Sequence, residues 1–366
     1  MPIYMDRHDI PDEIKPEHVA KMHQEDLKVQ HLYDCKGMTY WCDSERHTAF
    51  CLIEAPNKEA IQNMHNHAHG AFPHQIIEVD PHLVESFLGR IEDPEKAEDQ
   101  DLNIIDDPAF RVIMVIEASN FLNRLEGKQL SLFTQKFHQS ASKAFEKYEG
   151  NIVRENDKSY LVSFKSVSNA VICALKIQSK FKYSYPKIDS EHKRLKIGLC
   201  AGLPVTDKQG IFSEAVYLAT QMCELMKDEI IVTAAIKALY ENENRNAIID
   251  NEMIRILKPR EENFLLRLVE FCESTWNSSD FNLTQMSKSL GNSTSQIYRK
   301  LKKLTGKAPS VFMREYRLHK ALELIHQQKG NISEIAFETG FNSAGYFAKC
   351  FHDKYGILPS KYARLV

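Results

Sequence analysis

Histidines are concentrated near the start of the chain, and two of their spacings suit a metal site. His65 and His69 are four residues apart in a segment with helical periodicity, so both imidazoles project from one face and can bind one ion. His23 and Asp26 are three apart on a second predicted helix and form a similar pair. Imidazole and carboxylate ligands, joined by the thiolate of Cys51, suit nickel, zinc, copper or cobalt, and affinity order alone does not choose among them.

The predicted elements of the first 80 residues bring these two pairs together. Short strands are predicted at 2–8, 38–43, 49–54 and 75–79, with helices at 17–33 and 58–69. That order is β-α-β-β-α-β, the ferredoxin-like arrangement. Both helices then lie on one face of the sheet, so ligands from each can converge on one ion. Ten of the 15 histidines precede residue 83, and the alternative to a metal site is a histidine-rich solvated surface.

The same segment resembles a small family of nickel-binding, ferredoxin-like bacterial proteins that are dimers. The words that carry the resemblance are MPIYMDRH, HQEDLKVQ, YWCDSE, FCLIEAP and HNHAHG. The resemblance implies nickel as the most favoured metal, and the candidate ligands within these words are His8, His23, Cys51, His65 and His69, with His67 as a weaker candidate. Residues 1–100 hold 9 basic and 20 acidic side chains, a balance that favours cations and disfavours DNA.

The last eighty residues contain the same helix–turn–helix pattern twice. Residues 284–290 and 293–304 are predicted helices separated by a Gly291–Asn292 turn, and Gly306 follows the second helix. Residues 332–339 and 342–355 repeat this layout around Gly340. A helix, a tight turn and a second helix form a helix-turn-helix, whose second helix enters the DNA major groove. A predicted helix over 310–328 joins the two copies and sets the distance between their second helices.

These residues resemble the AraC/XylS family of bacterial transcription regulators. The words SLGNSTSQIYRKLKKLTGKAPSVFMREYRLHKAL and NISEIAFETGFNSAGYFAKCFHDKYGILPSKY carry the resemblance. It implies double-stranded DNA as partner, with base-edge contacts from Ser295, Tyr298 and Arg299 in the first copy and from Ala344, Gly345, Tyr346 and Lys349 in the second. Lys302 and Lys303 are candidates for phosphate contacts. Because Ala344 and Gly345 are small, the second copy is expected to contact mainly phosphates.

Charge agrees with this interpretation. Residues 261–366 hold 15 basic and 10 acidic side chains, a net of +5, whereas the whole chain carries −3. A basic excess in the part that holds both helix-turn-helix copies favours a polyanion partner and predicts salt-sensitive binding.

The middle of the chain alternates strands and helices and predicts an α/β domain with a mixed sheet. It resembles the class III nucleotide cyclase catalytic domain in the words VIMVIEASNF, EGNIVRENDKSYLVSF, AVICALKIQ, RLKIGLCAG and IFSEAVYLATQM. Such cyclases hold two metal ions with two carboxylates. Glu117 matches the first. At the second, Lys158 stands where Asp is expected, although a one-residue slip would place Asp157 there.

Two further departures in the cyclase-like region argue against catalysis. Tyr217 and Gln221 replace the asparagine and arginine that would orient the sugar and stabilise the transition state. No catalytic residues are therefore assigned, and the chain is not expected to be an enzyme. The middle domain is expected to dimerise or to bind a small molecule or nucleotide.

Taken together, the sequence predicts a multidomain α+β protein. Its parts are a histidine-rich ferredoxin-like metal-binding domain (1–90), an acidic solvated linker (91–108), a degenerate cyclase-like α/β domain (109–258) and an all-α double helix-turn-helix domain (259–366). Scattered cysteines, the absence of a long apolar run and the lack of a signal-peptide pattern favour a cytoplasmic protein. The expected function is metal-regulated transcription by a homodimer. The alternatives are an active nucleotide cyclase with an attached DNA-binding module, and a metal store.

Overall fold

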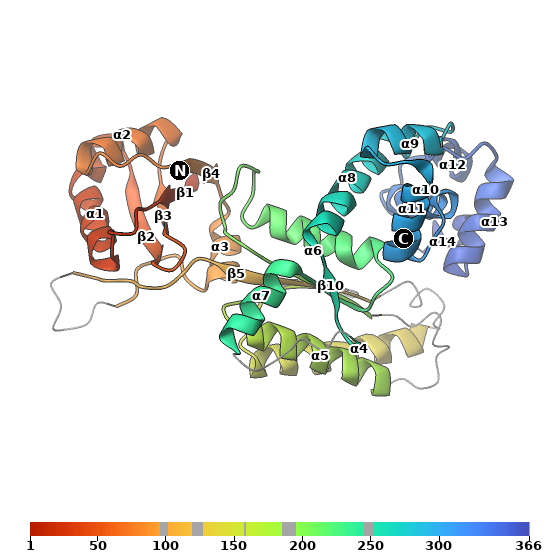
Figure 1. Ribbon diagram of the computed structural model, residues 1–366, viewed down its shortest axis with the longest axis horizontal. Coiled ribbons are helices and arrows are strands. Elements are labelled where there is room, and N and C mark those ends of the chain that lie inside the picture. Colours follow the sequence, from red (N-terminus) through yellow and green to blue (C-terminus); the bar gives the residue numbers. More distant parts are fainter. Residues whose placement is uncertain (96–101, 119–126, 157–158, 185–194, 245–251, 366) are drawn as a thin grey trace.

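The computed structural model describes residues 1–95, 102–118, 127–156, 159–184, 195–244 and 252–365. Three parts follow one another along the chain: a small sheet with helices, a larger sheet with helices on both faces, and an all-helical region (Figure 1). The predicted class, a multidomain α+β protein, is confirmed at this level. Within the described residues, no helix combines the length and apolar character that a membrane span needs.

The first part follows the predicted β-α-β-β-α-β order. Its strands are β1 (Ile3–Asp9), β2 (Lys36–Asp43), β3 (Thr48–Glu54) and β4 (Gln75–Glu78), paired antiparallel in the order β2-β3-β1-β4. Helix α1 (Pro16–Val29), the 3-10 turn Gln30–Tyr33 and helix α2 (Lys58–Ala68) complete it. The helix predicted over 17–33 is thus shorter than expected, because the chain tightens into the 3-10 turn and then adopts a left-handed conformation at Asp34 (φ 52°).

Alternation along β1 decides which side chains meet the helices. Successive strand residues point to opposite faces of a sheet. Tyr4 belongs to the buried cluster beneath α1 and α2, whereas Met5 belongs to the cluster on the other face. Asp6 and His8 share the parity of Tyr4 and therefore face the helices. In α2, Asn57 accepts a hydrogen bond from the backbone of Ala60, which fixes the start of the helix that carries His65 and His69.

The sequence predicts a solvated linker between the first two parts, but part of this segment is buried. Ile105 is buried among the side chains of the first part, and its backbone amide donates to the Tyr40 hydroxyl. Helix α3 (Pro81–Leu88) packs against the second sheet through Phe87 and Leu88. The buried guanidinium of Arg111 donates to the carbonyls of both residues. These contacts join the two parts firmly. Within the linker predicted over 91–108, the buried Ile105 departs from the expected solvation.

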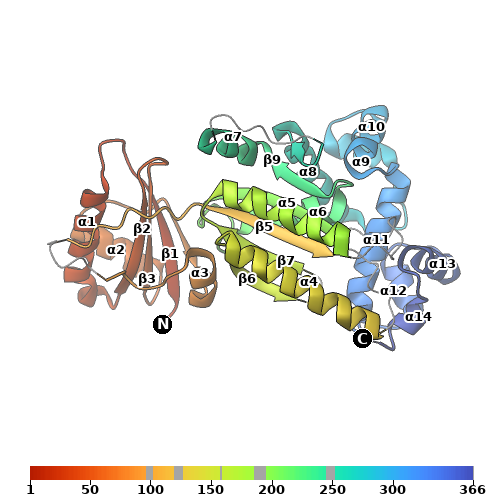
Figure 2. The same cartoon turned by 90° about the horizontal axis from the view of Figure 1, so that it is seen from below.

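The middle part is a six-stranded mixed sheet in the order β10-β9-β8-β5-β7-β6. Its strands are β5 (Arg111–Ala118), β6 (Asn151–Asn156), β7 (Ser159–Phe164), β8 (Leu195–Gly202), β9 (Ile230–Thr233) and β10 (Arg255–Leu257). Helices α4 (Gly127–Lys147), α5 (Val167–Ser184) and α7 (Ala234–Glu243) pack on one face, and α6 (Ser213–Leu225) packs on the other (Figures 1 and 2). The sequence predicts strands at 110–117, 152–154, 160–164, 195–201 and 229–233 and helices at 131–148, 167–181 and 213–226, and each has a counterpart in the structure. Helix α7 and strand β10 were missed because their apolar patterns are short.

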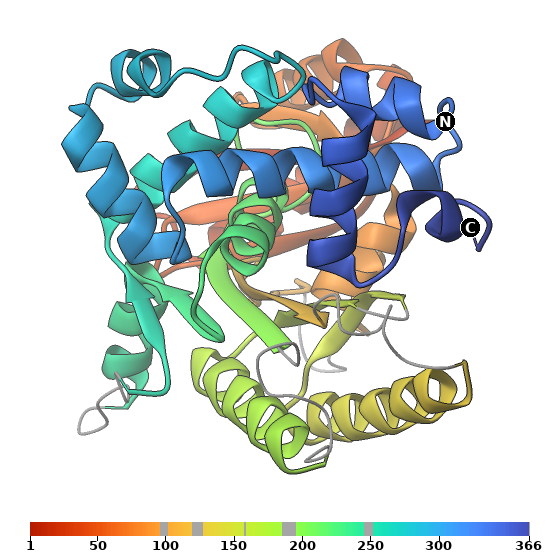
Figure 3. The same cartoon turned by 90° about the vertical axis from the view of Figure 1, so that its right-hand side faces the viewer.

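The all-helical region contains both predicted helix-turn-helix units. The first consists of α9 (Leu283–Leu290) and α10 (Thr294–Thr305), and the second of α12 (Ile332–Glu338) and α13 (Ala344–Tyr355). Helix α11 (Pro309–His326) connects them, as expected. Two helices were not predicted: α8 (Pro259–Thr275), which leads in from the middle part, and the short α14 (Pro359–Tyr362). Figure 3 shows α11 lying across the face of the molecule opposite α4 and α5.

Buried side chains link the three parts unequally. One continuous apolar cluster runs from the outer face of the first sheet, through α6 and α8, to the core of the first helix-turn-helix unit. The second unit has a cluster of its own, built around Phe341, Phe347 and Phe351 on one side of α11. The first unit therefore shares a core with the middle part, and the second does not.

Candidate metal centre and nucleic-acid interface

The first group of possible metal ligands lies between α1 and the end of α2. Asp26, His65 and His69 each offer a ligand atom within 4.8 Å of the others. Nδ1 of His65 is 3.0 Å from the Asp26 carboxylate, and Nε2 of His69 is 3.2 Å from the same oxygen. The four-residue spacing of the two histidines and the helix-to-helix approach predicted from the sequence both occur here.

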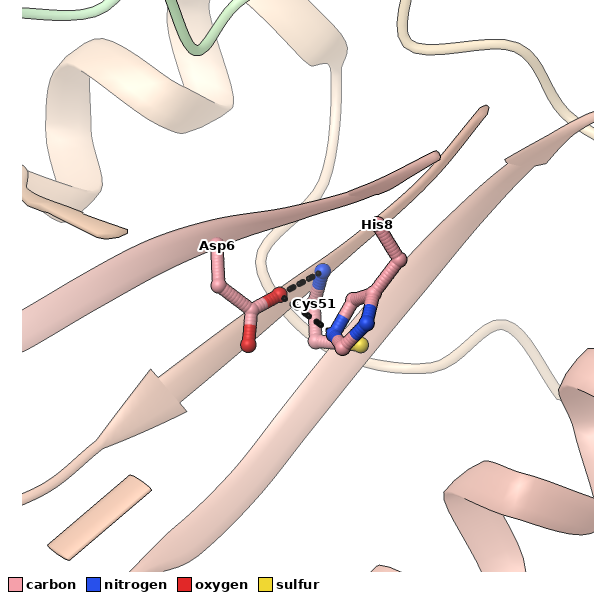
Figure 4. Close-up of side chains that lie close together, drawn as sticks. All are labelled: Asp6, His8 and Cys51. Atoms are coloured by element: carbon pink, nitrogen blue, oxygen red, sulfur yellow. Dashed lines mark hydrogen bonds and ion pairs between the residues drawn. The ribbon is translucent and has the colours of Figure 1, made fainter. Parts of the chain in front are cut away.

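A second group lies directly beneath the first, on the sheet. Asp6 and His8 of β1 and Cys51 of β3 also offer ligand atoms within 4.8 Å of one another, and all three are buried (Figure 4). The Cys51 backbone amide donates to Asp6 Oδ1 at 3.0 Å, and His8 Nε2 lies 3.5 Å from the same oxygen. Cys51 pairs with Asp6 across the two strands, which explains why residues 45 positions apart meet.

His65 joins the two groups into one buried network. Its Nε2 lies 2.8 Å from Asp6 Oδ2, while its Nδ1 contacts Asp26. Burial opposes a charged imidazole, but hydrogen bonds to Asp26 and Asp6 outweigh it and raise the pKa of His65 to about 10. Burial likewise opposes the Asp6 carboxylate, yet His8 and His65 hold its pKa well below the usual range. His65 therefore stands between two carboxylates and contacts both.

The residues present fit a transition metal. They supply imidazole nitrogens, carboxylate oxygens and one sulfur, the ligand types that nickel, zinc, copper and cobalt accept. Nε2 of His8 is buried and has no hydrogen-bond partner in the described part of the chain. Its contact with Asp6 Oδ1, at 3.5 Å, is longer than a normal hydrogen bond, and coordination of a metal would satisfy this nitrogen better. Burial, with a smaller contribution from Asp6, raises the pKa of the Cys51 thiol well above its usual value, so this sulfur becomes an anion only beside a cation.

Four of the five predicted ligands are brought together, and one is not. His8, Cys51, His65 and His69 take part in the two groups, whereas the imidazole of His23 turns away and lies 3.3 Å from Asp93 and against the Tyr40 ring. His67 is exposed and contacts the Tyr33 hydroxyl. Asp6 was missed. Strand alternation with His8 was the signal that could have found it, since both residues share one face of β1.

The second helix of the first unit has the ends predicted for it. The Ser293 hydroxyl accepts a hydrogen bond from the Gln296 backbone amide, and the Ser293 backbone amide donates to the Gln296 side-chain oxygen. Gly306 ends the helix in a left-handed conformation (φ 76°). Ile297, Leu301 and Leu304 are buried on its inner face. The outer face carries the predicted DNA contacts, all of them exposed: Ser295, Tyr298, Arg299, Lys302 and Lys303.

Lys303 differs from its neighbours on this outer face. Its ammonium is 2.8 Å from Glu261 of α8, a carboxylate that also binds Arg255. The Lys303 side chain is exposed, and it also links α10 to α8 and to the middle sheet. No partner is seen for Lys302 within the described residues, which leaves that side chain better placed for a phosphate.

The second helix of the second unit presents a smaller face. Gly345, Tyr346 and Lys349 are exposed, and Ala344 is half-buried. Arg314 of α11, which sequence reasoning did not single out, donates to the Tyr346 hydroxyl at 3.3 Å. A basic side chain from the connecting helix therefore stands beside the predicted contact residues of α13.

Arg317 ties the turn of the second unit to the segment that follows α8. Its guanidinium donates to the carbonyl of Gly340, in the turn of the second unit, and to the carbonyls of Trp276 and Ser278, just after α8. Gly340 has φ 75°, and a Cβ there would meet backbone oxygens at 3.0 Å. The turn therefore requires glycine for its conformation and for this close approach.

The cyclase-like positions of the middle part are dispersed. Glu117 lies at the end of β5 and faces a cavity whose other wall is α11. Tyr217 and Gln221 lie on α6, half-buried and buried respectively. Asp157 and Lys158 lie outside the described residues. Of the two carboxylate positions predicted to hold metal ions in a cyclase, only that of Glu117 lies within the described residues.

Comparison with known proteins identifies the two ends of the chain. Residues 4–79 match the family model described as nickel responsive protein SCO4226-like, and residues 286–365 match a helix-turn-helix domain model. The solved structure of SCO4226 from Streptomyces coelicolor A3(2) is 32% identical and covers 21% of this chain and 94% of that one, with a TM-score of 0.20.

Two curated relatives were also found. Histidine kinase P4 from Formosa agariphila is 34% identical over 102 residues, which are 28% of this chain and 7% of that protein. The uncharacterised HTH-type transcriptional regulator YdeC from Bacillus subtilis is 30% identical over 73 residues, 20% of this chain and 25% of the relative. The chain thus spans a quarter or less of either protein. What the comparisons establish is a helix-turn-helix domain over residues 286–365 and a segment, residues 4–79, that is similar to the SCO4226-like family.

Proposed function

We propose that this chain is a transcription regulator that binds double-stranded DNA through its C-terminal domain and a transition metal, nickel most favoured, through its N-terminal domain. The observation that carries the proposal is the pair of helix-turn-helix units whose second helices hold exposed basic and aromatic side chains on one outer face each. The match of residues 286–365 to a helix-turn-helix domain supports it.

The two helix-turn-helix units are proposed to make different contacts with DNA. Arg299, which is exposed on α10, would read a base edge, because a guanidinium can bond two acceptors of guanine at once. Lys302 and Lys349 would contact phosphates. Tyr346 and Arg314, which are hydrogen-bonded to each other, would hold the second unit on the backbone of the next groove.

Selection of bound sequences from a random duplex pool tests DNA binding. The wild-type protein is expected to enrich one sequence, and Arg299→Ala is expected to lose preference at one position of it. Lys329→Ala is the matched control, because Lys329 is an exposed cation on neither recognition helix. Failure of the wild-type protein to enrich any sequence at moderate salt would refute the proposal.

The metal part of the proposal rests on the buried network of the first domain. We propose Asp26, His65 and His69 as one set of ligands, and Asp6, His8 and Cys51 as a second set adjacent to it. His23 is retained only as a neighbour, since its imidazole contacts Asp93. A bound divalent ion would supply positive charge at a site that already places two carboxylates beside a buried imidazole nitrogen that makes no hydrogen bond to a described residue.

Elemental analysis of the purified, untagged protein tests metal binding. Nickel or another transition metal is expected near stoichiometry and is expected to disappear in the double variant His65→Ala/His69→Ala. His31→Ala serves as control because His31 is an exposed histidine of the same domain. Since His65 is buried, Cys51→Ser and circular dichroism distinguish loss of ligands from loss of fold. Equal metal content in all variants would refute the assignment.

We further propose that metal and DNA binding are coupled. One apolar cluster connects the first domain, the middle part and the first helix-turn-helix unit, so a change of packing in one reaches the next. A coupling of about 1–3 kcal/mol is usual for allosteric proteins. DNA affinity measured with and without nickel at fixed salt tests it, and equal affinities would exclude coupling.

The middle part is proposed to have no catalytic role and to support a homodimer. Its edge strand β6 is largely exposed and carries Ile152, a large apolar side chain with 38% exposure. Sedimentation of the purified protein is expected to give a dimer that Ile152→Asp weakens, whereas a wild-type monomer would exclude this role. Formation of a cyclic nucleotide from ATP or GTP with Mn²⁺ would overturn the assignment as non-catalytic.

A further inference from the structure

Glu261 lies where the middle sheet meets the first helix-turn-helix unit. It belongs to the first turn of α8, which follows strand β10 after the single residue Lys258 (Figure 1). Both oxygens of its carboxylate accept a hydrogen bond from Nη2 of Arg255 on β10, each of 2.8 Å. The ammonium of Lys303 on α10 also lies 2.8 Å from this carboxylate. One carboxylate therefore connects the middle sheet, α8 and the helix proposed to read DNA.

The two cations are bound to Glu261 unequally. Arg255 contacts both carboxylate oxygens, whereas Lys303 contacts only Oε1. The Arg255 side chain is 23% exposed, and that of Lys303 is 61% exposed. The backbone amide of Lys258 adds a third hydrogen bond, of 3.1 Å, to Oε2. Glu261 is thus held on the side of the middle sheet, and its contact with Lys303 is the one most open to solvent.

The charge of Glu261 can remain compensated when Lys303 leaves. Burial opposes this charge, but Lys303, the Lys258 amide and Arg255 together hold the pKa of Glu261 below its usual value. With Arg255 in place, the half-buried carboxylate keeps a cation after Lys303 has moved away. Without Arg255, the carboxylate would depend on Lys303 alone. Arg255 therefore sets the free-energy cost of releasing Lys303.

A DNA phosphate would compete with Glu261 for the Lys303 ammonium. Lys303 shares the outer face of α10 with Tyr298, Arg299 and Lys302, and all four side chains are exposed. The flexible four-carbon stem of a lysine lets its ammonium move between neighbouring anions. Because an exposed ion pair is weak, a duplex phosphate can displace the carboxylate.

We propose that Glu261 makes an autoinhibitory contact: it withholds Lys303 from DNA in the free protein, and Arg255 of the middle sheet sets how strongly. The inference rests on the proposed function, since it requires α10 to contact DNA. Because β10 leads into α8 through one residue, a rearrangement of the middle sheet shifts Arg255 relative to Glu261 and changes the availability of Lys303. The middle part thereby adjusts the affinity of the protein for its duplex.

Competition binding of the full-length protein to the duplex that it selects tests the proposal. Glu261→Gln removes the charge but keeps an acceptor for the Lys258 amide, and it is expected to raise DNA affinity about twofold to fivefold, the range for an exposed ion pair. Arg255→Gln is expected to lower DNA affinity by a similar factor, because Glu261 then retains Lys303. In a Lys303→Gln background, both effects are expected to shrink to the size of their controls.

The matched controls are Glu270→Gln and Arg260→Gln, which make the same changes of charge at exposed positions of α8. Circular dichroism verifies that each variant is folded. A gain in Glu261→Gln no larger than in Glu270→Gln, or one that persists undiminished with Lys303→Gln, overturns the autoinhibitory contact. A loss in Arg255→Gln no larger than in Arg260→Gln overturns the role of the middle sheet. These results leave the proposed function standing, whereas a wild-type protein that binds no duplex refutes the proposed function and this inference together.

Discussion

The two helix-turn-helix units have the same local design but different attachments. In both, the second helix begins at a serine whose hydroxyl accepts a backbone amide and ends at a left-handed glycine. The first unit shares its apolar core with α6 and α8, and the backbone amide of Lys227 in the middle part donates to Leu304 at the end of α10. The second unit has a separate core and is carried by α11.

This difference indicates how the region would respond to a signal. A change in the middle part would move the first unit directly, because the two share a core. The second unit would follow through α11 and through the Arg317 contacts to Gly340. Motif repetition in the sequence therefore does not imply equal roles, and the anchored unit is the better candidate for control by the other domains.

The largest test of the comparison removes one buried side chain from each core. Phe351→Ala in the second unit should lower stability by about 3–5 kcal/mol, since its ring is fully buried. If the two cores are separate, amide exchange should increase mainly in residues 332–362. Leu301→Ala, in the first unit, should instead also increase exchange in α6 and α8. Equal spreading of both effects would show that the second unit is not independent.

Arg317→Ala should have the next largest effect. Its guanidinium donates to one backbone carbonyl in the turn of the second unit and to two just after α8, and hydrogen bonds from a charged donor contribute about 1.5–3 kcal/mol. We expect a loss of stability of about that size, and a fall in affinity for a full DNA site but little change for a half-site. Lys329→Ala is again the control. Unchanged affinity for the full site would mean that Arg317 does not set the spacing of the units.

Substitutions on the two recognition helices should differ in kind. Arg299→Ala should cost about 1–3 kcal/mol of DNA affinity and relax sequence preference, whereas Lys349→Ala should weaken all sequences alike and reduce the salt dependence. Competition binding at two salt concentrations separates these outcomes. The reverse pattern would assign base reading to the second unit and phosphate binding to the first.

A pH dependence tests the contact between the middle part and α11. The pKa of Glu117 is raised from 4.5 to about 7 by burial, so its stabilising contribution is complete below pH 4.5 and is lost as the pH rises through 7. The contribution of Glu117 to the free energy of unfolding of the wild type should therefore fall by about 2–3 kcal/mol between pH 5 and 8. Denaturant titration should show a smaller fall for Glu117→Gln. An identical fall in that variant would mean that Glu117 is not desolvated by α11.

The local features of the C-terminal region could be predicted from the sequence because each depends on neighbouring residues. Ser293, Gly291 and Gly306 set the ends of the helices wherever the rest of the chain lies. The strand order of the first domain was predicted from the alternation of its apolar residues. Helix α8 was missed even though Pro259 stands at its first turn, because nothing in its own residues says which part it packs against.

The metal network was predicted in part, and the missing part is instructive. The pair His65 and His69 follows from helical spacing. Helical spacing does not predict that Asp6, rather than His23, lies beside His65. That outcome depends on which strand lies beneath α2 and on the contact between His23 and Asp93. Cys51 reaches its neighbours through the cross-strand pairing of β1 and β3.

By itself, the sequence determined the three-part organisation, the two helix-turn-helix units with their caps, and the concentration of metal-binding side chains in the first domain. These depend on periodicity and on interactions a few residues long. Only the tertiary structure decided that the first unit shares a core with the middle part, that the second does not, and that Glu117 faces α11 across a cavity. Such contacts join residues up to 200 positions apart in a 366-residue chain, and they depend on the burial of surfaces that no local pattern specifies.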